Sequence, residues 1–187
     1  MNYFDKDWEK HNELIYRSSD PKIKFTKITP KLYLSGEPCR SDVLWLVSKG
    51  IKNVLSVAKE CHDTCIGYGD ALKLVHIGFR DHVPMEPWLV LSAMHTLKAM
   101  LKTGPTLVHC GVGISRSPTT IALYWYAKGI TNSIEEGVQK LVEKRPCVAP
   151  NRIVDEKVIE VVEDLRAKWS KSKSESDATT TLSGDAR

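Results

Sequence analysis

The segment from Leu107 to Pro118 constrains the fold of this chain more than any other stretch. It reads LVHCGVGISRSP, so an apolar strand ends at Cys110, a loop with two glycines follows, and a helix begins near Ser115. This order places a thiol at the carboxyl end of a strand and in front of a helix N-terminus. Ligands of open α/β sheets bind at that edge. The segment therefore predicts a sheet protein with a binding site at the end of this strand.

The remaining chain alternates short apolar strands with amphipathic helices. We expect strands over residues 25–28, 32–34, 53–57, 72–79 and 106–110. We expect helices over residues 41–49, 88–102 and 114–128, a further helix capped by Ser133 with Glu136 completing a capping box, and a last helix over 153–169. This pattern predicts an α/β fold in one domain, with a central, mostly parallel sheet of about five strands flanked by helices. A length of 187 residues fits a single core.

Both ends of the chain differ from this pattern. We interpret residues 1–24 as an N-terminal extension and residues 25–169 as the catalytic domain. Residues 170–187 are rich in Ser, Thr and Ala and offer one large aliphatic side chain, Leu182. Such a segment buries too little to offset its ordering entropy, so we expect a disordered tail.

Composition excludes several classes of protein. The net charge of +4 is too small to argue for nucleic acid, and the longest apolar run, residues 121–127, is too short to span a membrane. The N-terminus lacks the apolar core of a secretion signal. Five irregularly spaced cysteines favour free thiols in a reducing compartment. We expect a cytoplasmic monomer that binds neither nucleic acid nor membranes.

The loop after Cys110 is suited to binding an anion. Successive backbone N–H groups in such a loop form a concave nest, and the helix dipole adds positive potential. The planar fork of Arg116 can hold two oxygens of a phosphate. The residues expected to bind the phosphate of a substrate are Gly111, Val112, Gly113, Ile114, Ser115 and Arg116.

The same surroundings act on the thiol of Cys110. A cysteine at a helix N-terminus near cations ionises more readily than a free one, and the thiolate is the nucleophilic form. We therefore expect a reactive sulfur, accessible from solvent, that attacks the phosphorus of a bound phosphate ester.

The motif HCxxGxSRS resembles the signature of cysteine-dependent protein phosphatases, and GISRSPT at 113–119 resembles their dual-specificity branch. The segments ITPKLYLSG, GIKNVLSVAKE and RPCVAPN resemble segments of that branch in the same order. The similarity runs from about residue 25 to residue 168. It implies a dual-specificity phosphatase-like fold and a cysteinyl-phosphate intermediate.

The resemblance also assigns roles around Cys110 and Arg116. It implies that Asp81, in the loop after the strand 72–79, is the general acid, that Ser117 hydrogen-bonds the sulfur, and that His109 braces the loop. It implies no metal and no cofactor, because loop amides and Arg116 stabilise the charge. Asn151 resembles a position that steadies the site.

Each of these roles has a simpler alternative. Asp81 is one of several carboxylates in this part of the chain, with Asp63, Asp70 and Glu86 nearby in sequence. The hydroxyl of Ser117 could instead cap the helix, and the roles of His109 and Asn151 could be structural.

The remaining cysteines have weaker signals. The stretch Cys61-His62-Asp63-Thr64-Cys65 invites a metal interpretation, but no second pair has structural zinc spacing, so we predict no metal site there. A disulfide between Cys110 and one of these thiols is an alternative. Cys39 and Cys147 are simplest as core or surface thiols.

The function that follows is a protein phosphatase acting on phosphotyrosine, with phosphoserine and phosphothreonine as further candidates. Phosphorylated proteins are then the partners. A phosphoinositide or RNA 5′-phosphate phosphatase shares the loop chemistry, and a non-catalytic phosphate-binding scaffold is a third reading. The loop lacks the lysines expected for inositol lipids, and the chain keeps Cys110, Arg116 and Asp81, which silent relatives tend to lose.

Overall fold

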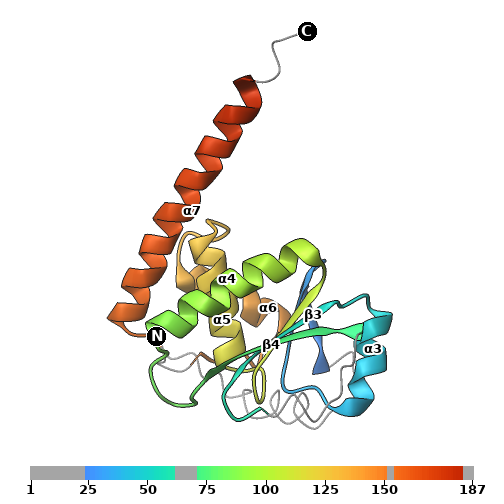
Figure 1. The fold of residues 1–187 in the computed structure, drawn as a ribbon. Coiled ribbons are helices and arrows are strands. Elements are labelled where there is room, and N and C mark those ends of the chain that lie inside the picture. The colour runs from blue at the N-terminus through green and yellow to red at the C-terminus, as the bar shows by residue number, and fades with distance from the viewer. Residues whose placement is uncertain (1–23, 62–70, 151–153, 183–187) are drawn as a thin grey trace.

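A five-stranded sheet forms the centre of the molecule (Figure 1). The computed structural model describes residues 24–61, 71–150 and 154–182. The strands are β1 (Thr26–Thr29), β2 (Leu32–Ser35), β3 (Asn53–Ala58), β4 (Lys73–Phe79) and β5 (Thr106–His109). Their order across the sheet is β1-β2-β5-β3-β4. Strand β1 is antiparallel to β2 and the other pairs are parallel, which confirms the predicted α/β fold.

The helices lie on both faces of this sheet. A short 3-10 turn, η1 (Arg40–Asp42), leads into α3 (Val43–Ser48). The others are α4 (Pro87–Thr103), α5 (Arg116–Ala127), α6 (Ile134–Lys144) and α7 (Glu156–Leu182). Figure 1 shows α3 apart from the group formed by α4, α5 and α6.

Alternation along the strands divides the core into two layers. Leu55 of β3 and Val108 of β5 belong to the larger cluster, together with α4, α5 and α7. Their neighbours Val54 and Leu107 belong to a smaller cluster with Leu46 of α3. Because side chains alternate between faces with a period of two, one strand supplies both layers.

The start of α6 differs in detail from the predicted capping box. The Ser133 hydroxyl accepts a hydrogen bond from the Glu136 backbone N–H at 3.1 Å, as expected. The Glu136 carboxylate, however, accepts from the backbone N–H of Asn132 at 2.7 Å, one residue before the cap.

Helix α7 is longer than the sequence predicts. It continues past Trp169 to Leu182, into the segment expected to be a disordered tail. Residues 170–182 contain no glycine or proline, so nothing in their sequence interrupts the backbone hydrogen bonds of the helix. Figure 1 shows this end of α7 projecting away from the other helices. Most of the N-terminal extension, residues 1–23, lies outside the described residues.

Within the described residues, no helix combines the length and the apolar character needed to cross a bilayer.

Candidate active site

The loop 110–115 lies at the middle of the sheet edge. It joins β5 to α5, and β5 pairs with β2 on one side and β3 on the other. The carboxyl ends of these parallel strands meet at one edge, so residues that follow β2, β3 and β4 surround the loop. The segment after α6 supports it as well, because Ala149 donates from its backbone N–H to the Ile114 carbonyl at 3.0 Å.

Gly113 gives the loop its tight course. Its φ of +71° lies in the left-handed region that side chains disfavour. A Cβ on Gly113 would lie 2.4 Å from the backbone carbon of Ser35 at the end of β2. The loop therefore packs against β2 at a distance that only glycine permits.

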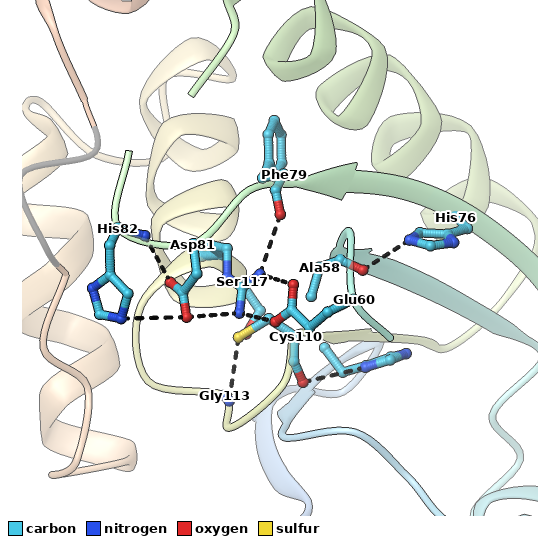
Figure 2. A network of polar contacts seen from close by, with 11 residues as sticks. Ala58, Glu60, His76, Phe79, Asp81, His82, Cys110, Gly113 and Ser117 are labelled. Atoms are coloured by element: carbon cyan, nitrogen blue, oxygen red, sulfur yellow. Dashed lines mark hydrogen bonds and ion pairs between the residues drawn. The ribbon is translucent and has the colours of Figure 1, made fainter. Parts of the chain in front are cut away.

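Two donors converge on the sulfur of Cys110 (Figure 2). The Gly113 backbone N–H and the Ser117 hydroxyl each lie 3.2 Å from Cys110 Sγ. Both stabilise negative charge on the sulfur. Ser115, not Ser117, is the N-cap of α5, and no side chain caps that helix. Ser117 therefore does not cap the helix, and its hydroxyl donates to the Cys110 sulfur instead.

The sulfur is less accessible than the sequence suggests. Cys110 is 1% exposed, and the Gly113 N–H of its own loop and the Ser117 hydroxyl of the first turn of α5 lie against its sulfur. His109, at the end of β5, is fully buried, and its Nδ1 lies 3.4 Å from the Cys110 carbonyl oxygen. His109 thus contacts the backbone of the loop, as a bracing residue would.

Arg116 is the buried cation of the site, with only 2% of the residue exposed. Its Nη1 donates to Glu60 Oε2 at 2.7 Å and to the Phe79 carbonyl at 3.1 Å. Its Nη2 donates to Glu60 Oε1 and, at 3.1 Å, to Asp81 Oδ2. The buried Nε has no hydrogen-bond partner in the described part of the chain. One donor of the guanidinium is therefore left without an acceptor in this part of the chain.

The charges around Arg116 determine its protonation. Burial alone would lower the pKa of Arg116, but the hydrogen bonds to Glu60 and the nearby charges of Cys110 and Asp81 raise it on balance. The same contact with Arg116 holds the pKa of Glu60 below its ordinary value. Arg116 and Glu60 are thus a charged pair at neutral pH.

Asp81, predicted to be the general acid, contacts Arg116 at the same edge of the sheet. It follows β4 in the chain, its side chain is 38% exposed, and its second carboxylate oxygen faces Arg116. Its Oδ1 accepts from the backbone N–H of His82 at 3.1 Å. Of the other carboxylates considered, Glu86 pairs with Arg80 at 3.2 Å, and Asp63 and Asp70 lie outside the described residues.

Glu60 is a site residue that the sequence analysis missed. It follows β3, the strand next to β5, and Figure 2 shows its carboxylate near Cys110 and Asp81. The available signal was its position: a carboxylate just after a buried strand that neighbours the strand of the nucleophile. Nothing in the sequence joined it to Arg116, its partner 56 residues away.

No metal site accompanies this arrangement in the described residues, where no group of three or more His, Cys, Asp or Glu side chains could hold an ion. Cys39 is an exposed thiol, Cys147 is buried, and neither forms a disulfide. Cys65 and Asn151 lie outside the described residues, so the interpretations placed on them remain predictions.

The fold and the site define an α/β protein with a buried thiol at the start of the loop between β5 and α5 and a buried arginine at the end of that loop. The chain belongs to the dual specificity phosphatase family: the model of the dual specificity phosphatase catalytic domain matches residues 32–164. The human protein named dual specificity protein phosphatase 16 is 36% identical over 131 residues, which are 67% of this chain and 19% of that protein. The chain thus spans about a fifth of the length of this relative.

Solved structures share the fold. TpbA of Pseudomonas aeruginosa, as a cysteine-to-serine variant in complex with phosphotyrosine, superposes with a TM-score of 0.62 at 21% identity, covering 82% of this chain and 94% of TpbA. PTPMT1 in complex with PI(5)P superposes with a TM-score of 0.63 at 16% identity, covering 80% and 99%.

Proposed function

We propose that the chain is a protein phosphatase that hydrolyses phosphotyrosine, and phosphoserine or phosphothreonine where the pocket admits them, through a cysteinyl-phosphate intermediate. The observation that carries this proposal is the surroundings of Cys110. Two hydrogen-bond donors point at one sulfur, and a buried guanidinium with an unpaired Nε belongs to the same loop. The proposed nucleophile, Cys110, and the groups proposed to bind the phosphate therefore belong to one continuous segment, the loop after β5 and the first turn of α5.

The first step transfers the phosphoryl group to the enzyme. The amides of residues 111–115 and Arg116 hold the non-bridging oxygens, and Cys110 Sγ attacks phosphorus. An S–P bond forms as the bond from phosphorus to the ester oxygen breaks. Protonated Asp81 gives its proton to that oxygen, and positioned proton transfer of this kind contributes about 10²–10⁴-fold.

The second step releases phosphate. Asp81, now ionised, takes a proton from water as the water oxygen attacks phosphorus, and the S–P bond breaks. The Ser117 hydroxyl, at 3.2 Å, stabilises the departing sulfur as a thiolate. Charge stabilisation by preorganised donors replaces a metal ion in both steps.

Binding requires a rearrangement, because Cys110 is enclosed. Asp81 and Glu60 both bind Nη2 of Arg116, and their side chains are 38% and 53% exposed. A phosphate oxygen can compete for Arg116 when Asp81 rotates away. That rotation also frees Asp81 to reach the leaving oxygen.

The loop favours a singly phosphorylated group. Residues 111–115 carry no lysine, which argues against the multiply charged head group of an inositol lipid. TpbA, which was solved with phosphotyrosine, is more similar to this chain in sequence than PTPMT1, which was solved with PI(5)P, at 21% against 16% identity, and this difference also favours a phosphotyrosine substrate. A cytoplasmic location, a monomeric state and a catalytic domain over residues 25–169 belong to the same proposal.

The test is hydrolysis of p-nitrophenyl phosphate by the wild type and by Cys110→Ser, Arg116→Lys and Asp81→Asn. We expect Cys110→Ser to be inactive, and the other two to lose about 10²-fold or more in kcat. Cys39→Ser, which removes an exposed thiol, and Glu86→Gln, whose carboxylate pairs with Arg80, are controls expected to keep activity. An inactive wild type, or full activity in Cys110→Ser, would contradict the proposal.

The natural substrate can be sought with a trapping variant. Asp81→Ala is expected to retain binding while it slows turnover, and so to retain tyrosine-phosphorylated proteins. Capture of phosphoinositides or 5′-phosphorylated RNA, with no phosphoprotein, would favour the alternative substrate classes.

A further inference from the structure

A second buried arginine lies behind the loop. Arg145, the C-cap residue directly after α6, is 1% exposed. Its Nε donates to the Gly113 carbonyl at 3.0 Å and its Nη2 donates to the Val112 carbonyl at 3.3 Å. Its Nη1 donates to Thr26 Oγ1 at 2.9 Å and to the Lys24 carbonyl at 3.2 Å. One guanidinium thus ties the loop to the start of β1.

The contact with Val112 has a geometric consequence at the sulfur. The Val112 carbonyl and the Gly113 N–H belong to one peptide group. In a trans peptide these two groups point in opposite directions. Because Arg145 holds the carbonyl on one side, the N–H is turned to the other side, where it donates to Cys110 Sγ at 3.2 Å. Arg145 also holds the Gly113 carbonyl. This contact fixes the next peptide group in the same way, and with it the direction of the Ile114 N–H.

The charge of Arg145 is also unusual. Among the described residues, its hydrogen-bond partners are three backbone carbonyls, the Thr26 hydroxyl and the Cys147 sulfur, and no carboxylate pairs with it. Burial lowers its pKa, while the charges of Cys147 and Cys110 act in the opposite direction. A guanidinium stays protonated in proteins, and a buried charge without a counter-charge is costly. Burial raises the pKa of the Cys147 thiol, which disfavours its charged form. The groups that can offset the charge of Arg145 at this loop are therefore the Cys110 thiolate or a bound phosphate.

We propose that Arg145 is a positioning residue of the active site, which orients the Gly113 and Ile114 amides toward the sulfur and the substrate phosphate, and whose charge favours the anionic loop. Arg145 touches neither the sulfur nor the substrate through the bonds described. It acts through the peptide groups that it holds. This inference rests on the proposed function, but one of its readouts does not require turnover.

The experiment compares Arg145→Met and Arg145→Lys with the same changes at Arg166. Arg166 is a matched control, because its Nη1 also donates to two backbone carbonyls, those of Tyr126 and Thr131, at a site away from the loop. Three quantities are measured on folded protein. They are the rate of Cys110 alkylation by iodoacetamide at one fixed pH, inhibition by orthovanadate, and kcat with p-nitrophenyl phosphate. Peptide mass spectrometry assigns the alkylated cysteine.

We expect Arg145→Met to slow Cys110 alkylation about tenfold and to weaken orthovanadate inhibition by a similar factor. Arg145→Lys keeps the charge but loses the planar fork, so it should keep more of the alkylation rate than Arg145→Met and still lose kcat. The Arg166 variants should lower Tm and leave all three quantities unchanged. If Arg145→Met does not fold, the test rests on Arg145→Lys, whose kcat is compared with that of Arg166→Lys.

Arg145 variants that lower only Tm, with alkylation, inhibition and kcat unchanged, would overturn the inference and leave a structural role. An inactive wild type whose Cys110 alkylation still depends on Arg145 would contradict the proposed function and support the positioning role.

Discussion

A comparison of Gly113 with Gly129 separates two effects of adding a side chain: strain in a left-handed backbone, and a steric clash with neighbouring residues. Both have left-handed φ values, +71° and +68°, but a Cβ at Gly129 meets nothing within 4 Å, whereas one at Gly113 meets the backbone of Ser35 and Gly36. Alanine in the left-handed region costs about 1–2 kcal/mol. We expect Gly129→Ala to lose about that much stability and keep activity. Gly113→Ala should lose more stability and nearly all activity.

Urea unfolding and p-nitrophenyl phosphate turnover measure these two effects. Equal losses in the two glycine variants, with activity retained in both, would show that the loop does not depend on its contact with β2.

Glu60 is expected to contribute to catalysis because its carboxylate accepts hydrogen bonds from both terminal nitrogens of Arg116 and so orients the guanidinium. Glu60→Gln keeps the shape of the side chain but replaces charge-assisted hydrogen bonds with neutral ones, which are weaker. We expect kcat/KM to fall about tenfold, the equivalent of about 1.4 kcal/mol in the barrier. Glu86→Gln serves as the control carboxylate. A kcat/KM in Glu60→Gln equal to that of the wild type would mean that Arg116 needs no support from β3.

Single residues were predictable to the extent that their neighbours in sequence are also their neighbours in space. Cys110, Gly113, Arg116 and Ser117 share one loop and one helix start, so their relations could be expected from the sequence. Glu60 and Arg145 reach the loop from 56 and 32 residues away, through chain crossings that the sequence does not specify. The expectation of a solvent-accessible sulfur failed for a different reason, because it did not account for how closely Gly113 and Ser117, from the same loop and helix start, lie against the sulfur.

Among the secondary-structure elements, α7 packs against the domain through Trp169, and its helical backbone continues beyond that residue. Trp169 is 8% exposed; it packs edge-on against His95 and Tyr124, and the Lys98 ammonium lies 4.1 Å from its ring centre. Among the residues of α7 up to Ser172, for which burial is described, it is the last one in the buried core. The helix continues to Leu182 through a segment without glycine or proline.

This difference gives a prediction for the C-terminal boundary. Trp169→Ala is expected to lose about 3 kcal/mol or more, as for other large buried aromatic residues. A chain ending at Ser172 should unfold at nearly the wild-type temperature and keep its activity. Thermal unfolding followed by circular dichroism makes the comparison. A large loss of Tm on truncation would place stabilising contacts beyond the proposed boundary.

At the scale of the whole molecule, the sheet order brings the reactive groups together. With β5 between β2 and β3, and β4 beyond β3, the segments after four parallel strands meet at one edge. This edge holds four groups of the candidate site, which are the Ser35 backbone that packs against the loop, the carboxylates of Glu60 and Asp81, and the sulfur of Cys110. The alternation of strands and helices predicted the parallel sheet, but not this order, which depends on pairing between strands distant in the chain.

The central claim is that Cys110 carries the phosphoryl group between the two steps. The most direct measurement is rapid-quench analysis of Ser117→Ala with p-nitrophenyl phosphate, because loss of the hydroxyl at 3.2 Å should slow the departure of the sulfur. We expect a burst of p-nitrophenol equal to the enzyme concentration, with one phosphoryl group on the peptide that contains Cys110. Turnover with neither a burst nor a phosphorylated Cys110, or a phosphoryl group found on another residue, would contradict it.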